Sequence, residues 1–404
     1  MDSSKSPGHF CSPTQFPLAG RRFLWNPAPP MPVYSIMQSP PGPETVIDGT
    51  RYLYFGGTSY LGLAAHPEVI EAGCEALRKF GVHSATSRAR FGTNPPVLEV
   101  EQRAAKFFGT EDAFYFGSGY AANHIMVPAL AGEADVVLVD ESAHYCVNEA
   151  ARLAGKPVIT YRHRDADDLA RLARDHKRAL VLTDGVGPTT GALAPVKDLL
   201  RALQECETAS LLIDDAHGFG VLGGDGRGLL DQEGLWPQVN GASPRSGPQI
   251  YVCGTLAKAL GGFGGVIPGT NEFVARARGA SHYFDGASAP ASAEAAATAK
   301  ALEIVTRDPS LRSRLRENTL RLRKGLNALG LTTPAGAAAN FGVSAGDAGD
   351  MSRIHEALKV RGIMLPYVAR YSGIPPAGLL RFAVFANHST GQIDHLLSEL
   401  GSLL

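Results

Sequence analysis

Short apolar runs alternate with longer amphipathic stretches over much of the chain. The apolar runs are DAFYF (112–116), DVVLVD (135–140), RALVLTD (178–184), SLLIDD (210–215) and QIYVCG (249–254). Between them lie stretches with helical periodicity, such as residues 95–109 and 195–207. Continuous apolar strands joined by helical crossovers predict an α/β fold with a mostly parallel central sheet and helices on both faces.

The pattern changes near residue 290. Helix-forming stretches are followed by a strand candidate at Asn340–Ser344, a helix at Asp350–Arg361, a strand at 379–386 and a final helix. We therefore expect a large domain at residues 56–290 and a smaller C-terminal α+β domain at residues 291–404. Residues 231–249 predict a surface loop, because they are rich in turn-forming residues.

The first 55 residues fit neither pattern. Ten of the 27 prolines fall in residues 1–45, which disfavours helix and sheet and predicts an extended arm over residues 1–55. Such an arm either wraps a partner subunit or stays disordered. The start of the chain lacks the apolar segment of a signal peptide, and no apolar run reaches membrane-spanning length.

The composition disfavours some classes of binding partner. Of the 404 residues, 44% are hydrophobic and 19% charged, and the formal net charge is -1, which gives no electrostatic reason to bind nucleic acid or an anionic membrane. The five cysteines are scattered and include no C-x-x-C pair. This usage predicts reduced thiols in a cytoplasmic protein, and neither disulfides nor a metal site.

Polar residues follow four of the predicted strands. They are Ser118, Gly119 and Tyr120 after the first strand, His144 after the second, Asp214 and His217 after the fourth, and Thr255 and Lys258 after the fifth. Ligands of open parallel sheets bind outside the carboxyl ends of the strands, so we expect these residues to meet at one edge.

Each of these residues also has an ordinary structural explanation. Ser118 and Gly119 could simply cap a helix, His144 could be a hydrogen-bonded structural histidine, and Asp214 could belong to a turn. Lys258 could extend to solvent. Their convergence on one edge favours a functional site over four separate structural roles.

Lys258 suggests the chemistry. It is the only Asp, Glu, Lys or Arg between Ser246 and Asn271, and it lies among glycines and apolar residues. Desolvation lowers the pKa of a lysine and exposes its amine as a nucleophile for Schiff-base chemistry. Together with an aspartate for a pyridinium nitrogen and a helix N-terminus for a phosphate, this lysine indicates pyridoxal 5'-phosphate (PLP).

Two other motifs are rejected. GFGVLG (218–223) matches the glycine pattern of a dinucleotide site, but the glycine-rich GDGRG (224–228) follows where a helix is required. Lys258 is not part of a G-K-[ST] sequence, so it is not a P-loop lysine.

Two longer motifs, IDDAHGFGVLGGDGRG (213–228) and GTLAKALGGFGG (254–265), resemble those of the α-oxoamine synthases. Further matches are YLGLAAHPEV (60–69), SGYAAN (118–123) and LLRFAVFANHST (379–390), so the resemblance runs from about Phe55 to the C-terminus. It implies the fold of fold-type I PLP-dependent transferases, a homodimer with active sites at the subunit interface, and amino acid and acyl-CoA substrates.

The resemblance also implies residue roles. Lys258 matches the lysine that bonds covalently to PLP, Asp214 the partner of the pyridine nitrogen, and His217 the histidine near the ring hydroxyl. His144 matches the histidine stacked on the ring. The residues matching the phosphate site are Ser118, Gly119, Tyr120 and Thr255, and Arg381 matches the arginine that binds the substrate carboxylate. From its position alone, Arg381 could equally lie on the solvent-exposed face of its strand.

Several positions depart from the family pattern. They are Ser59 for the usual Asn, Val97 for a His, Tyr145 for a small residue, and GVGPTTG (185–191) for GVFSMDG, which replaces a hydroxyl by Pro188. DDAHG is most similar to the 8-amino-7-oxononanoate synthases, which would use alanine and a pimeloyl thioester. Transamination on the same scaffold and a non-catalytic family member are the alternatives left open.

Overall fold

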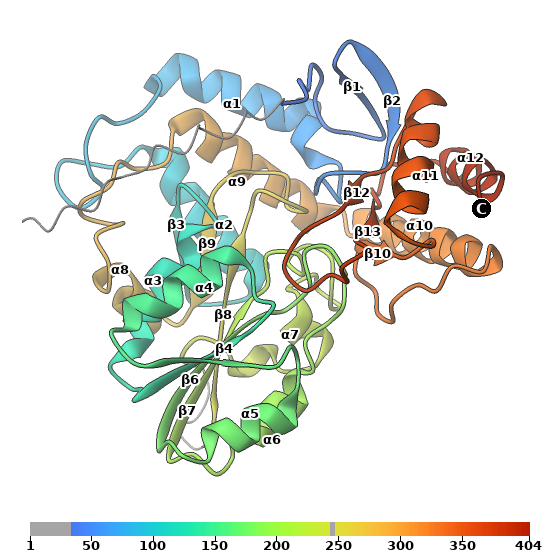
Figure 1. Ribbon diagram of the computed structural model, residues 1–404. Helices are drawn as coiled ribbons and strands as arrows, with labels where there is room; N and C mark the ends of the chain where they lie inside the picture. Colours follow the sequence, from blue (N-terminus) through green and yellow to red (C-terminus); the bar gives the residue numbers. More distant parts are fainter. Residues whose placement is uncertain (1–33, 243–246) are drawn as a thin grey trace, which may run out of the picture. The chain divides into compact units, whose positions relative to one another are not determined.

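Seven strands form the central sheet of the structure, a computed structural model that describes residues 34–242 and 247–404 (Figure 1). Their order is β3 (Asp112–Phe116), β9 (Gly265–Gly269), β8 (Gln249–Thr255), β7 (Thr208–Asp214), β6 (Arg178–Asp184), β4 (Val136–Asp140) and β5 (Val158–Tyr161). From β8 to β5 every pairing is parallel, whereas β9 is antiparallel to both β8 and β3. The predicted, mostly parallel sheet is confirmed, and β3 runs in the same direction as the parallel strands.

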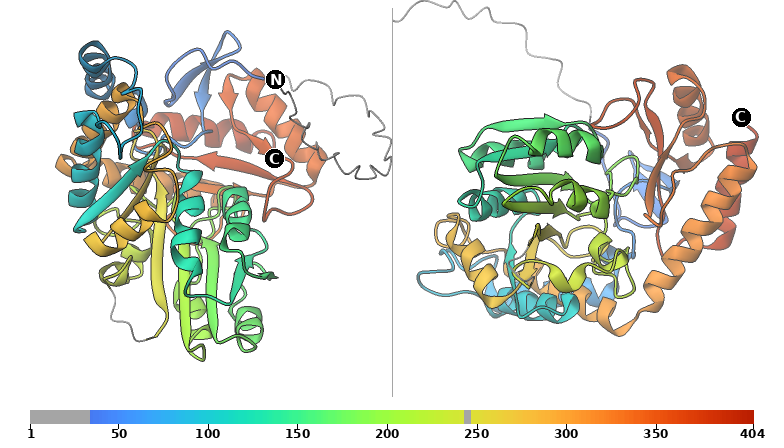
Figure 2. Two further views of the ribbon diagram at one scale, coloured as in Figure 1. Left: turned by 90° about the vertical axis from the view of Figure 1, so that its left-hand side faces the viewer. Right: turned by 90° about the horizontal axis from the view of Figure 1, so that it is seen from below.

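Helices cover both faces of this sheet because successive strand residues point to opposite sides. One face packs against α3 (Ala121–Ala131), α4 (Tyr145–Ala151) and α8 (Asn271–Gly279). The other face packs against α2 (Pro95–Phe108), α5 (Ala166–Ala173), α6 (Val196–Ala202), α7 (Leu229–Gln232) and α9 (Ser292–Arg307), and α1 (Pro67–Phe80) lies on α9 (Figure 2). On β4, Val137 and Leu138 belong to these two different cores.

In the part of the chain that the structure describes, two smaller sheets and three helices complete the fold, and one of these sheets joins two N-terminal strands to a C-terminal one. One sheet pairs β10 (Asn340–Val343), β13 (Leu379–Ala383) and β12 (Tyr367–Val368), and the other pairs β1 (Glu44–Ile47), β2 (Thr50–Tyr54) and β11 (Ile363–Met364). The helices are α10 (Ser310–Ala328), α11 (Ala348–Val360) and α12 (Thr390–Gly401). Among the described residues, no helix combines the length and apolar character needed to cross a membrane.

The β1–β2 hairpin differs from the extended arm predicted through residue 55. Its turn, Asp48-Gly49, has φ values of 49° and 78°, which fit the type I′ turn favoured by Asp-Gly. The available sequence signal was the Asp-Gly pair between two short runs, ETVI and TRYLY, that contain β-branched and aromatic residues. Residues 1–33 of the arm lie outside the described residues, and the boundaries 56–290 and 291–404 stay predictions.

The predicted surface loop at 231–249 is wrong around Trp236 and Asn240, which are both buried. Trp236 Nε1 donates to the carbonyl of Phe108 at 2.8 Å, and Asn240 Nδ2 donates to the carbonyl of Val252 at 2.8 Å. These side chains satisfy backbone groups inside the fold, a role that turn-rich composition does not reveal.

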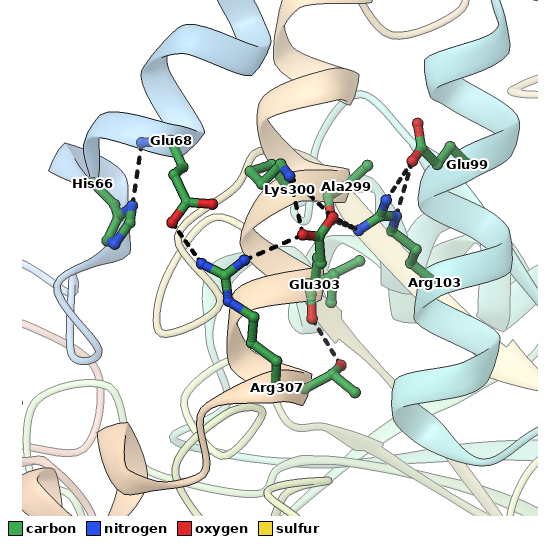
Figure 3. Close-up of polar contacts among 10 residues, drawn as sticks. His66, Glu68, Glu99, Arg103, Ala299, Lys300, Glu303 and Arg307 are labelled. Atoms are coloured by element: carbon green, nitrogen blue, oxygen red, sulfur yellow. Dashed lines mark hydrogen bonds and ion pairs between the residues drawn. The ribbon is translucent and has the colours of Figure 1, made fainter.

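Charged side chains join α1, α2 and α9 at the surface (Figure 3). Arg103 pairs with Glu99 and Glu303, and Arg307 pairs with Glu303 and, at 2.5 Å, with Glu68. Solvent screens pairs of this kind, so each contributes less than about 1 kcal/mol.

Candidate active site

The carboxyl ends of β3, β4, β7 and β8 meet at one edge of the central sheet, as the sequence predicts. A cavity of about 230 Å³ opens there. Its walls are Gly119, Tyr120, His144, Cys146, Asp184, Val186, Pro188, Asp214, Ala216, His217, Thr255 and Lys258. Of the nine residues predicted for the site, only Ser118 and Arg381 are absent from these walls.

Lys258 lies in the turn between β8 and β9. Burial lowers its pKa from the ordinary value, while Asp214 and Asp184 act in the opposite direction. The glycines around it allow close packing: Gly261 has a φ of 67°, and a Cβ there would lie 2.2 Å from the Cβ of Leu63. The turn therefore holds an amine with lowered proton affinity inside a walled cavity.

Asp214 is buried at the end of β7. Its Oδ2 accepts a hydrogen bond from Asn123 Nδ2 at 2.6 Å and lies 3.6 Å from Cys146 Sγ, and its Oδ1 accepts from the backbone N–H of Ala216 at 3.1 Å. The neighbouring Asp215 is fully buried and accepts from the N–H of Leu229 at 2.5 Å. Only Asp214 lines the cavity, which distinguishes the two adjacent carboxylates.

His144 is the N-cap of α4. Its Nδ1 accepts from the backbone N–H of Cys146 at 3.3 Å, and Cys146 Sγ lies 3.0 Å from the same nitrogen. Burial lowers the pKa of His144, with Asp214 opposing and Lys258 adding to the effect. Because Nδ1 is an acceptor, the neutral ring carries its proton on Nε2.

His217 is connected to Arg381 through a residue that was not predicted, Tyr60. Arg381 Nη2 lies 3.4 Å from Tyr60 Oη, and Tyr60 Oη lies 2.8 Å from His217 Nδ1. A guanidinium only donates, so the Tyr60 hydroxyl accepts from Arg381 and keeps its own proton, which it can donate to Nδ1 of His217 when that ring is protonated on Nε2. Burial, followed by Lys258 and Arg381, lowers the pKa of His217 well below its ordinary value.

Gly119 and Thr255 bring two chain segments into close contact. A Cβ on Gly119 would lie 2.6 Å from Thr255 Cβ and Oγ1, so the position requires glycine. Thr255 Oγ1 donates to the carbonyl of Gly264 at 2.8 Å. Ser118 is exposed at the start of α3, where its Oγ accepts from the N–H of Tyr120 at 3.3 Å. This is the helix N-terminus predicted to hold an anion.

The four departures from the family pattern lie in different surroundings. Pro188 lines the cavity, and its carbonyl accepts from Arg381 Nε at 3.0 Å. Tyr145 is half exposed and makes an edge contact with Tyr371. Ser59 is buried, and Val97 is a fully buried core residue of α2.

Four residues around the cavity were missed by sequence reasoning: Tyr60, Asn123, Cys146 and Asp184. Asp184 ends β6, so the strand-end rule could have found it. Asn123 lies on α3, at the end of the quoted SGYAAN motif, and Cys146 lies on α4, two residues after His144. Helical position alone does not show that they face Asp214.

The sequence matches the family described as "Aminotransferase class I and II" over residues 51–400. It is 35% identical to the putative 8-amino-7-oxononanoate synthase of Desulforudis audaxviator, covering 90% of this chain and 93% of that protein. It is 36% identical to the 8-amino-7-oxononanoate synthase of Maricaulis maris, covering 88% of each.

The fold is also similar to that of solved structures. A serine palmitoyltransferase with a PLP internal aldimine superposes with a TM-score of 0.83 at 28% identity, covering 92% of each chain. The serine palmitoyltransferase of Sphingomonas wittichii superposes with a TM-score of 0.82 at 26% identity, covering 91% of each.

Proposed function

Because this chain belongs to the aminotransferase class I and II family, and within it to the PLP-dependent α-oxoamine synthases, we propose that it condenses an amino acid with an acyl-CoA thioester. The condensation releases CoA and CO2 and yields an α-aminoketone. The observation that carries this proposal is the meeting of Lys258, Asp214, His144, His217 and Thr255 in one cavity.

The residues present fit PLP. Lys258 offers an amine with a lowered pKa, and Asp214 is fixed by Asn123 and the N–H of Ala216. Gly119 and Tyr120, just before α3, line the cavity beside Thr255, where a helix N-terminus suits a phosphate. When bound, PLP supplies an aldehyde that condenses with amines and a ring that stores an electron pair.

Each side chain then has a specific task. The Lys258 amine holds the cofactor at rest and takes the proton from the substrate Cα. With PLP bound, Asp214 would hold a proton on the pyridine nitrogen, and His217, oriented by Tyr60, would donate from Nε2 to the ring hydroxyl. His144 would cover one face of the ring. Arg381 retains N–H groups beyond those given to Pro188, Gly57 and Tyr60, and these bind the substrate carboxylate.

For the substrates, we propose alanine and a pimeloyl thioester. Relatives named 8-amino-7-oxononanoate synthase, 35–36% identical over about 90% of the chain, support this choice. The likeness to serine palmitoyltransferases makes serine with a long-chain acyl-CoA the pair to test against it.

We also propose that the enzyme is a cytoplasmic homodimer. The described cysteines, Cys74, Cys146, Cys206 and Cys253, are all free thiols, which suits a reducing compartment. The family resemblance supports the dimer.

A two-part experiment tests the function. The purified protein is incubated with PLP and reduced with borohydride, and the modified peptide is identified by mass spectrometry. We expect the label on Lys258, no label in Lys258→Ala, and normal labelling in Lys177→Ala, which changes an exposed lysine. Alanine, serine and glycine are then paired with pimeloyl-CoA and palmitoyl-CoA, and free CoA thiol is measured.

Alanine with pimeloyl-CoA is expected to release CoA fastest. Release of an oxo acid without CoA would instead indicate transamination. A protein that takes up PLP but turns over no pair would support the non-catalytic alternative.

A further inference from the structure

Arg164 has an unusual environment in the turn between β5 and α5. Its Nε, Nη1 and Nη2 are buried, and no residue in 34–242 or 247–404 forms a hydrogen bond with them. Its backbone has a φ of 57°, a left-handed conformation that costs a non-glycine residue about 1 kcal/mol or more. Burial of an unpaired charge costs several kcal/mol. Nearby charges must therefore compensate for the burial of this guanidinium.

The compensating groups line a second, much smaller cavity of about 10 Å³ beside the active site. Arg164, Asp140 and Asp184 all contribute to its walls, and Asp184 and Pro188 belong to both cavities. A Cβ on Gly187 would lie 3.4 Å from Arg164 Nη2, so the guanidinium lies against a position without a side chain. Burial lowers the pKa of Arg164, whereas Asp140 and Asp184 raise it.

Within this small cavity, an anion is not the partner of Arg164. The cavity has room for about one water molecule, and two carboxylates in its walls repel negative charge. The balancing charges are therefore the carboxylates themselves, which line the same cavity but form no direct hydrogen bond with the guanidinium.

Of the two carboxylates, Asp184 has fewer hydrogen-bond donors around it, so the charge of Arg164 matters more for Asp184 than for Asp140. Asp140 already accepts from the N–H groups of Ser142 and Arg164 and pairs with His163 at 2.8 Å. Asp184 accepts a single hydrogen bond from the described residues, from the backbone N–H of His144 to Oδ2 at 2.7 Å. That N–H begins α4, so Asp184 sets the position of the His144 ring.

We propose that Arg164 is a positioning residue whose buried charge, in the small cavity next to Asp184, favours the ionised form of Asp184 and so strengthens its hydrogen bond with the backbone N–H of His144. The proposal concerns this chain's own contacts and rests on the proposed function only for its effect on turnover.

The charges around Asp184 show in which direction its pKa changes when Arg164 is removed. Burial and Asp214 on β7 raise its pKa to about 8, and Asp140 on β4 adds to the rise. The N–H of His144 and the Lys258 amine after β8 lower it. Arg164 is a further cation near Asp184, so its removal raises the pKa of Asp184. The protonated carboxyl accepts a weaker hydrogen bond than the carboxylate.

The test compares Arg164→Met with Arg164→Lys, which keeps the charge. Arg162→Met is the control, because Arg162 is a solvent-exposed cation in the same turn. The full-length protein is labelled with 15N-histidine, and the backbone amide of His144 is followed by NMR as a function of pH, with and without PLP. His144→Asn assigns the signal.

In Arg164→Met we expect the pH midpoint of the His144 amide shift to rise above the wild-type value, because a cation has been removed from beside a buried carboxyl. Arg164→Lys should restore the midpoint in large part, and Arg162→Met should leave it unchanged. An unchanged midpoint in a folded Arg164→Met protein overturns the proposal. If Arg164→Met does not fold, two other variants decide. The proposal is supported if Arg164→Lys keeps the wild-type midpoint and Asp184→Asn gives a displaced amide signal that does not change with pH. A wild-type amide signal in Asp184→Asn overturns the proposal.

Turnover provides a separate measurement. With the substrate pair found above, Arg164→Met should lower kcat several-fold and leave KM for the acyl-CoA unchanged. Failure of every substrate pair would contradict the proposed function, while the NMR result would still decide the role of Arg164.

Discussion

At the scale of single residues, the cavity holds two histidines whose neutral forms have defined tautomers. A hydrogen bond to Nδ1 sets the tautomer of each ring: it comes from Tyr60 for His217 and from the N–H of Cys146 for His144. Both histidines have lowered pKa values because they are buried near Lys258. Each ring therefore presents an Nε2–H donor, which suits a ring hydroxyl better than it suits a metal ion.

Tyr60→Phe tests this arrangement. The change removes one hydrogen bond to His217 and one from Arg381, each worth about 1 kcal/mol, so we expect kcat/KM to fall about thirtyfold. The His217 ring 15N signals should show mixed tautomers. Tyr283→Phe, at an exposed tyrosine outside the cavity, is the control. Wild-type kinetics and a single His217 tautomer would show that Tyr60 has no such role.

The sequence predicts those site residues that come shortly after the end of a strand. Lys258, Asp214 and His144 each follow a buried apolar run, and the topology of a parallel sheet brings such positions together. Tyr60 was missed because it follows no strand of the central sheet and reaches His217 across 157 positions of sequence. Arg164 was missed because nothing in its local sequence shows that the turn directs it inward.

At the scale of secondary-structure elements, one buried ion pair ties the segment before α2 to α2 and β3. Arg88 donates to both carboxylate oxygens of Glu101 at 2.8 Å and to the carbonyl of Tyr115, whose N–H donates back to Glu101. The two side chains are only 4% and 9% exposed. This pair differs in burial from the surface network of α1, α2 and α9 in Figure 3.

Glu101→Gln should therefore destabilise the protein far more than Glu303→Gln does. The first change leaves the Arg88 charge buried and unpaired and should lower the free energy of unfolding by about 3 kcal/mol. The second removes partly exposed pairs and should cost less than about 1 kcal/mol. Urea unfolding at neutral pH gives both values. Equal losses would mean that burial does not set the strength of these pairs.

At the scale of the whole molecule, the alternation of apolar runs and amphipathic helices is sufficient to predict the α/β class. It does not predict β9, whose GVIPG sequence is short and glycine-rich, nor the edge strand β5, which is mostly exposed. The β1–β2 hairpin was missed because the prolines before it dominated the composition. Composition averages over a window, whereas a two-residue turn is a local signal.

The described surface also bears on the proposed homodimer. Phe91 is 90% exposed, and Val82 in the same segment and Phe263 beyond Lys258 are also exposed. Val82 and Phe263 both adjoin α9, through its Ser292 and Thr298. Exposed apolar side chains on neighbouring segments are typical of subunit interfaces.

Phe91→Glu tests this assignment. Wild-type protein should sediment as a dimer in analytical ultracentrifugation, and the variant should shift toward monomer at micromolar concentration, because the introduced carboxylate must be desolvated in the interface. Val360→Glu is the matched control, since Val360 is similarly exposed on α11. If the dimer is the active form, the loss of activity in Phe91→Glu should follow the monomer fraction as protein concentration falls. A wild-type protein that is monomeric at all concentrations would contradict the proposed dimer, and a fully dimeric Phe91→Glu would place the interface elsewhere.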